Sequence, residues 1–111
     1  AAITQSGVLA VGGNAAFTGT DITLNNAANT FSGTVAFTGA NVGITDSTPL
    51  SLAASTATGT LALTSGGALT QTGAITVSGN ATLTAPGANI LLTNTGNNFS
   101  GTVAFTAGGS G

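Results

Sequence analysis

Cysteine, lysine, arginine, histidine, methionine, tryptophan and tyrosine are all missing from this chain of 111 residues. Without cysteine the chain has neither disulfide bonds nor thiolate ligands for a structural zinc site. Without lysine and arginine nothing neutralises phosphate, which excludes ordinary nucleic-acid binding and electrostatic attraction to anionic lipid. Asp21 and Asp46 are the two charged residues and give a net charge of −2.

The same absences bear on catalysis. A nucleophile needs a neighbouring base, and histidine, lysine and cysteine are all lacking. Paired carboxylates can act as acid and base, but Asp21 opens an expected strand and Asp46 lies in an expected corner, where Asp usually forms turn hydrogen bonds. Calcium prefers several anionic oxygens, and Gly19–Leu24 (GTDITL) matches calcium-binding repeats weakly. We therefore predict no enzyme activity, no metal and no cofactor.

The residues that are present favour an ordered chain. Apolar residues make up 41% of the sequence, whereas ordinary disorder goes with low hydrophobicity or high net charge. Gly, Asn, Ser and Thr interrupt the apolar stretches every few residues, so we expect no membrane-spanning helix. The length suits one domain, and we predict a single segment over residues 1–111.

One hexapeptide pattern, Gly-[Thr/Asn]-apolar-[Ala/Thr]-[Phe/Leu]-Thr, occurs five times. The copies begin at Gly13, Gly33, Gly59, Gly79 and Gly101, and the longest interval is the one between the second copy and the third. A period of about 22 residues, with strand-like alternation inside each copy, is typical of a stacked repeat array.

The alternation within each hexapeptide predicts which side chains point inward, because neighbouring side chains in a strand point to opposite faces. The predicted core stack takes its large apolar residues from the hexapeptides and from two other strands: Phe17, Phe37, Leu63, Leu83, Phe105, Phe31 and Phe99. The predicted outer face takes the last threonine of each hexapeptide: Thr18, Thr38, Thr64, Thr84 and Thr106.

Two further strands are expected in each repeat. The second strands are marked by Ile3, Ile22, Val42, Leu69 and Ile90, and the third strands by Leu9, Phe31, Leu50, Ile75 and Phe99. Corners that contain Gly, Asn or Pro separate the strands. Three short strands in about 22 residues predict an all-β fold, a three-sided parallel β-helix (β-solenoid) of about five rungs, each pairing with the next at about 4.8 Å.

A longer repeat is superimposed on the hexapeptides. Ile3–Thr18 matches Leu69–Thr84 position by position, and Asn29–Thr38 matches Asn97–Thr106 at an offset that is larger by two. The difference is expected to be an insertion at a corner, which a solenoid tolerates because corners project outward.

Two stretches, Asp21–Leu52 and Gly66–Ala85 (GGALTQTGAITVSGNATLTA), resemble the repeats of large secreted bacterial exoproteins of the filamentous-haemagglutinin type. Proteins of that type are exported by two-partner secretion or as autotransporter-like adhesins. The resemblance implies a right-handed parallel β-helix that forms a long extracellular or cell-surface shaft. It also implies adhesion, although the sequence identifies no receptor.

Three functions remain open from the sequence. A structural shaft segment is the function that we expect, and near-zero net charge with small outward side chains favours lateral association. An outward grid of Thr and Ala is also typical of ice-binding β-solenoids. Stacking of like residues at this spacing is typical of functional amyloid as well.

Both ends of the chain are expected to expose unpaired strand edges. Residues 107–111 are rich in Gly and Ser and resemble the corner that follows Thr64, although an artificial linker would look the same. We expect segments to join end to end, either covalently as tandem repeats or by head-to-tail stacking of copies. An open contact of that kind gives a filament.

Overall fold

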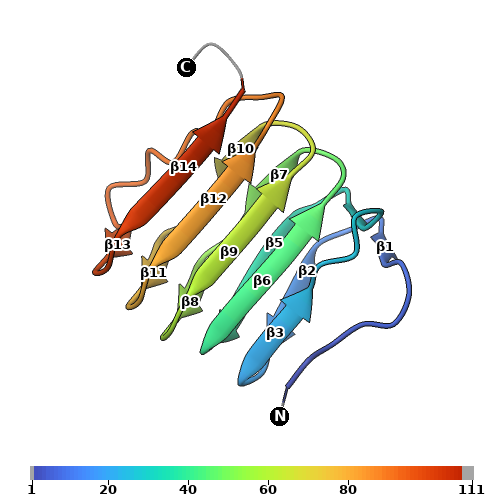
Figure 1. Cartoon of the computed structure of the whole chain (residues 1–111), viewed down its shortest axis with the longest axis horizontal. Coiled ribbons are helices and arrows are strands. Elements are labelled where there is room, and N and C mark those ends of the chain that lie inside the picture. Colours follow the sequence, from blue (N-terminus) through green and yellow to red (C-terminus); the bar gives the residue numbers. More distant parts are fainter. Residues whose placement is uncertain (1, 109–111) are drawn as a thin grey trace.

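The computed structural model describes residues 2–108 as a stack of β-coils (Figure 1). Within these residues there are fourteen strands and no helix, and every strand pairing is parallel. In Figure 1 the front strands run upward, the chain passes behind them, and each coil advances toward the C-terminus, which makes the coil right-handed. The predicted right-handed parallel β-solenoid is therefore confirmed.

One sheet runs along the whole stack and is called here the front sheet. In order it contains β3 (Asp21–Leu24), β6 (Asn41–Asp46), β9 (Leu61–Ser65), β12 (Ala81–Ala85) and β14 (Val103–Ala107). Ile3 adds a single bridge to Ile22 at the N-terminal edge of this sheet. The five strands mark five coils of the solenoid.

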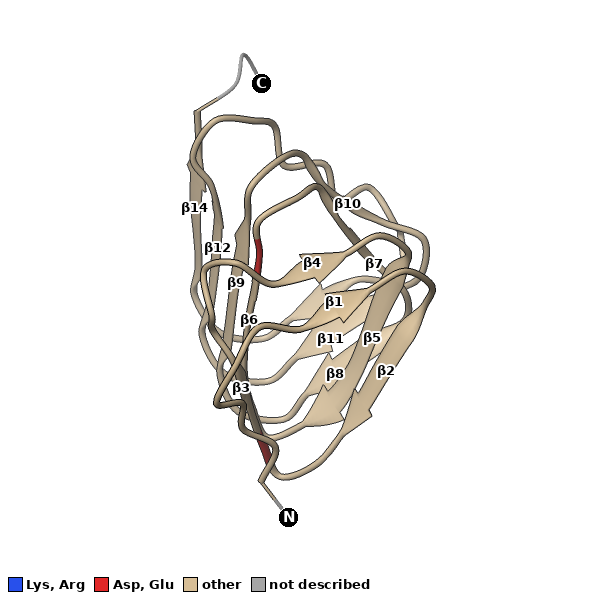
Figure 2. Ribbon diagram, turned by 90° about the vertical axis from the view of Figure 1, so that its right-hand side faces the viewer, with Lys and Arg blue, Asp and Glu red and all other residues tan. Residues whose placement is uncertain are grey.

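The remaining strands form the other sides of the coil. β1 (Ala10–Val11) pairs with β4 (Thr30–Phe31), and the larger back sheet contains β2 (Ala15–Thr18), β5 (Thr34–Gly39), β7 (Leu50–Leu52), β8 (Ser55–Ala57), β10 (Leu69–Gln71), β11 (Ile75–Val77) and β13 (Asn98–Phe99). The long strand β5 pairs with β7 through its first residues and with β8 through its last. From there each coil has three faces: the front sheet, a second face of β7, β10 and Ile90, and a third face of β8, β11 and β13 (Figure 2).

The core consists of apolar side chains that the coils enclose. In the front sheet the alternation of inward and outward residues matches the burial pattern, with Ile22, Leu24, Leu61 and Leu63 all at most 2% exposed. Burying a side chain of this size contributes about 1.5–3 kcal/mol. Because the core is one continuous column, each coil depends on its neighbours for its stability.

The repeated pattern predicts that the five hexapeptides form the first strand of each coil and stack in one column. This prediction is wrong, because the hexapeptides are divided between two sheets. Phe37 lies beside Phe17 in the back sheet and Leu83 beside Leu63 in the front sheet. The residue next to Leu63 on the other side is Ile44 rather than Phe37. The cause is the longer interval before the third hexapeptide, since β6, β7 and β8 all lie between β5 and β9.

The expected second and third strands are corrected for the same reason. Ile22 and Val42 pair with each other in the front sheet, whereas Leu69 pairs with Leu50 on the second face. An expected second strand therefore lies beside an expected third strand. The sequence markers identify strands correctly but assign several of them to the wrong face.

Three of the glycines that open hexapeptides lie where the backbones of successive coils approach each other closely. A Cβ atom on Gly79 would lie within 3.0 Å of the carbonyl oxygen of Gly59, and one on Gly101 would clash in the same way with Gly79. Gly33 has the same relation to Gly13. These contacts fall into two separate stacks, in agreement with the division of the hexapeptides between two sheets.

Candidate functional surfaces

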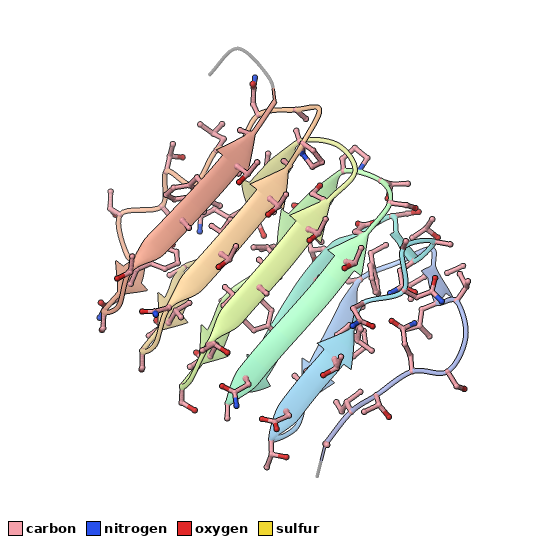
Figure 3. All side chains as sticks on the ribbon, viewed as in Figure 1. Atoms are coloured by element: carbon pink, nitrogen blue, oxygen red, sulfur yellow. The ribbon has the colours of Figure 1, made fainter. Side chains whose placement is uncertain are left out.

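The outward threonines are divided between two sheets. On the front sheet a continuous row, called here the front threonine column, consists of Thr45, Thr64, Thr84 and Thr106 in register (Figure 3). The other two predicted outer residues, Thr18 and Thr38, pair with each other in the back sheet, where Thr56 follows them. The predicted outer face therefore consists of two shorter rows that face different directions.

A second row of polar side chains connects the coils at the start of the front strands. The Nδ2 atom of Asn41 donates a hydrogen bond to Oδ1 of Asp21 at 3.2 Å, and Thr60 Oγ1 donates to Oδ1 of Asn41 at 3.1 Å. In the later coils the backbone N–H of Thr102 donates to Oδ1 of Asn80 at 3.0 Å. The carboxylate of Asp21 thus takes part in an exposed network between coils.

The second acidic residue, Asp46, is 1% exposed at the end of β6. Its Oδ1 atom accepts hydrogen bonds from Thr48 Oγ1 at 2.7 Å, from Thr48 N at 2.9 Å and from Phe31 N at 3.3 Å. Its Oδ2 atom has no hydrogen-bond partner among the described residues. In the next coil Ser65 lies beside Asp46, and its hydroxyl accepts a hydrogen bond from Leu50 N at 3.1 Å.

The two carboxylates do not converge on one site. Asp21 pairs with Asn41, the first residue of β6, whereas Asp46 is the last residue of that strand. The length of the strand keeps them roughly 16 Å apart, and Figure 2 shows them at opposite ends of the front sheet. Within residues 2–108 there is no group of three or more side chains of the kind that hold a metal ion.

A partly buried pair of side-chain amides, called here the Gln–Asn clamp, joins neighbouring coils. Asn29 is fully buried; it donates from Nδ2 to Gln5 Oε1 at 2.8 Å and accepts from Gln5 Nε2 at 2.9 Å. The same Oε1 atom accepts from Asn26 N at 3.0 Å, and Asn29 Oδ1 accepts from Leu9 N at 3.0 Å.

The clamp occurs twice. Asn97 and Gln71 exchange two hydrogen bonds of 2.7 Å each, Asn94 N donates to Gln71 Oε1 at 3.0 Å, and Ile75 N donates to Asn97 Oδ1 at 2.9 Å. Each of these residues is the equivalent of a first-clamp residue under the longer sequence repeat. From the sequence alone these asparagines are expected at corners, and the signal for the clamp is the Gln that recurs in both copies of the longer repeat.

The two ends of the stack expose residues of the core. At the C-terminal end an open apolar hollow is lined by Ile90, Leu92, Phe105 and Ala107. Of the predicted core stack, Phe31, Phe37, Leu63 and Leu83 are buried, Phe17 and Phe99 are partly buried, and Phe105 is 57% exposed. The rings of Phe17 and Phe31 meet edge to face, with centroids 6.0 Å apart.

The expected Gly/Ser-rich tail at 107–111 lies partly outside the described residues. Ala107 ends β14, and Gly108 N donates a hydrogen bond to Ala85 O at 3.1 Å. Residues 109–111 lie outside the part of the chain that the structure describes. Within residues 2–108 there is no helix that is both long and apolar enough to cross a bilayer.

Comparison with known sequences finds two stretches of the chain that match one family of repeats. Residues 1–38 and 39–106 each match the family described as repeats of unknown function (DUF5649). Both matches end at equivalent threonines, Thr38 and Thr106, and the second match is the longer of the two. No curated protein and no solved structure gives a significant match. The chain therefore belongs to this family of repeats.

Proposed function

We propose that this chain is a structural shaft segment of a secreted or cell-surface bacterial fibre, in which further repeats of the same family continue the solenoid at both ends. The observation that carries the proposal is a difference in burial between equivalent residues of the two repeats. Residues that are exposed at an open end of the stack are buried wherever the sequence supplies the next coil.

The C-terminal end illustrates this difference. Phe105 is 57% exposed, whereas its equivalent Phe37 is 1% exposed. Ile90 and Leu92 are partly buried, whereas their equivalents Ile22 and Leu24 are at most 1% exposed. In the first repeat the covering strands are β6, which pairs with β3, and β7 and β8, which pair with β5.

The N-terminal end shows the converse. Ile3, Leu9 and Phe17 are partly buried, while their equivalents under the longer repeat, Leu69, Ile75 and Leu83, are at most 1% exposed. In the second repeat β7, β8 and β9 lie beneath these residues, as the pairings of β10, β11 and β12 show. Both ends therefore lack the same cover, which the stretch 39–68 provides inside the chain.

The occupant that best fits each open end is thus another copy of the family repeat. Covalent tandem repeats and head-to-tail stacking of separate chains would both supply it, and both give an open filament. Unpaired backbone groups at the end coils also favour the addition of another coil, because an exposed strand edge is a template for pairing.

The extracellular part of the proposal is supported by sequence resemblance. The repeats resemble those of filamentous-haemagglutinin-type exoproteins, whose β-helices form shafts outside the cell. The absence of cysteine and of basic residues is compatible with such a shaft, and small uncharged outward side chains permit lateral contacts between shafts. The division of the threonines between two sheets favours a shaft over an ice-binding surface, which would use one regular array.

The proposal is tested by supplying the missing cover. Residues 107–111 are replaced by a copy of 39–68, so that the equivalents of β6, β7 and β8 follow Thr106. We expect amide hydrogen exchange in β14 to slow to the rate measured in β5 and the midpoint of thermal unfolding to rise. The matched control is the same extension with Asp at the positions equivalent to Val42 and Ile44, which cannot enter the apolar column. An extension that stays sensitive to protease and protects nothing would refute the proposal.

A further inference from the structure

The repeat unit is best counted in strands. Nine strands, β1 to β9, lie between Ile3 and its equivalent Leu69 in β10. Nine strands, β4 to β12, also lie between β3 and the equivalent bridge residue Ile90. The unit is therefore ten strand positions long, and the family match over 39–106 covers one such unit.

Ten positions do not fill a whole number of three-strand coils. A unit of ten advances the chain by three coils and one additional face. Equivalent strands of the two units lie on different faces wherever both members of a pair are present in the chain. β2 and β5 lie in the back sheet, whereas their equivalents β12 and β14 lie in the front sheet. Ile22 lies in the front sheet, whereas its equivalent Ile90 pairs with Leu69 on the second face.

The contacts inside the unit survive this change of face. Ile3 N donates to Asp21 O at 2.7 Å, and the equivalent Leu69 N donates to Asn89 O at 3.0 Å. Thr34 N donates to Asn14 Oδ1 at 2.9 Å, and the equivalent Thr102 N donates to Asn80 Oδ1 at 3.0 Å. The Gln–Asn clamp is likewise present in both units. The unit has thus turned as a body around the solenoid axis, because the same sequence makes the same contacts on another face.

We propose that successive units of the shaft are related by a screw operation of one face, about one third of a turn, with a rise of about 16 Å that follows from three and one third coils at about 4.8 Å each. Three units then restore the original face after ten coils, about 48 Å along the axis. The relation between the two units is a property of this chain, whereas its extension to further units rests on the proposed function.

The screw has a direct consequence for what the shaft presents to a partner. The hexapeptides of β9, β12 and β14 occupy one face over three consecutive coils. The next such group, one unit later, would lie on the second face, and the group after it on the third. A second shaft, or any ligand that recognises the unit, would find the same surface on all three sides, in a staircase with steps of about 16 Å.

Spin labels on the existing chain test the change of face. The variant T64C/T84C places labels on adjacent strands of the front sheet, since these residues are in register. The variant T38C/T64C places labels on consecutive hexapeptides that the structure assigns to different sheets. We expect strong dipolar broadening for the first pair and much weaker broadening for the second, with T18C/T38C as a second adjacent pair. Equal broadening in all three variants would overturn the screw.

The full array is tested with four tandem copies of 39–106 added to the chain, each carrying a small gold cluster at the cysteine of a T84C substitution. Electron microscopy should show the first and fourth clusters on one side of a continuous rod, about 48 Å apart, and the second and third on other sides. Clusters all on one side of a continuous rod would overturn the screw but leave the shaft intact. Failure to form a continuous rod would overturn the proposed function, while the spin-label result would still decide the arrangement within the chain.

Discussion

Two phenylalanines provide a matched test of the open-end argument, because they occupy the same position of the same hexapeptide, GTVAFT. Phe37 is 1% exposed and lies beneath the coil of β7 and β8, whereas Phe105 is 57% exposed at the last coil. Truncating a fully buried phenylalanine to alanine costs about 3–5 kcal/mol. Phe37→Ala should cost that amount. Phe105→Ala should cost about 1–2 kcal/mol, because less than half of its side chain is buried to begin with.

Urea unfolding is the suitable assay. The chain has no tryptophan or tyrosine, so circular dichroism rather than intrinsic fluorescence follows the loss of strand structure. In a solenoid a substitution in a terminal coil can fray that coil alone, and amide exchange in β14 and in β5 provides the local measurement for each variant. The ratio of the two losses is more informative than either value, since the deleted atoms are identical.

The decisive comparison repeats both substitutions in the chain extended by a copy of 39–68. Once the added coil covers Phe105, the cost of Phe105→Ala should rise to about 3–5 kcal/mol, while the cost of Phe37→Ala should stay the same. Equal costs for both substitutions in the unextended chain would refute the burial argument. A cost for Phe105→Ala that does not change on extension would refute the idea that another repeat occupies the end.

Three further substitutions test other contacts. Asp46→Ser should leave the free energy of unfolding unchanged or raise it by about 1–2 kcal/mol, because it removes a buried carboxylate oxygen without a partner and keeps an acceptor of the kind that Ser65 provides. Thermal unfolding measures the effect, with the exposed Asp21→Asn as control. A loss of more than about 1–2 kcal/mol would contradict this reasoning. Gln71→Leu should cost about 2–4 kcal/mol in urea unfolding, because it leaves the amide of Asn97 and backbone groups unpaired, and full stability would rule out the clamp. Gly79→Ala should destabilise by more than about 1 kcal/mol, because its Cβ would meet the backbone of the coil below, whereas Gly87→Ala, where a Cβ meets nothing within 4 Å, should be nearly neutral by the same measurement.

The sequence was sufficient to predict the parallel stack and all of its strands except β8, because period-two alternation and repeated turn residues are local signals. The sequence was not sufficient to predict the face of the coil on which each strand lies. The stretch from the second hexapeptide to the third contains four strand steps, from β5 to β9, and β8 (Ser55–Ala57) has no large apolar residue to mark it. The spacing of the hexapeptides therefore suggests one coil, whereas a count of strands gives one coil and a further face.

The Gln–Asn clamp was missed for a different reason. Its partners are 24 and 26 residues apart, so that no local pattern connects them. What the sequence did contain was the same Gln and the same Asn in both copies of the longer repeat. A polar residue that recurs at equivalent positions of a repeat, next to apolar neighbours, is therefore a candidate for a side-chain contact between coils.

A unit of ten strands in a three-sided coil also bears on how such a chain can grow during evolution. A gene segment that is duplicated in tandem needs to preserve whole strands and their corners, but it need not encode a whole number of turns. The front sheet accepts in β12 and β14 the sequences that the back sheet accepts in β2 and β5, so a new copy folds on whichever side it falls. Duplication or loss of one unit therefore lengthens or shortens the solenoid by ten strand positions, and the coils on either side keep their pairing.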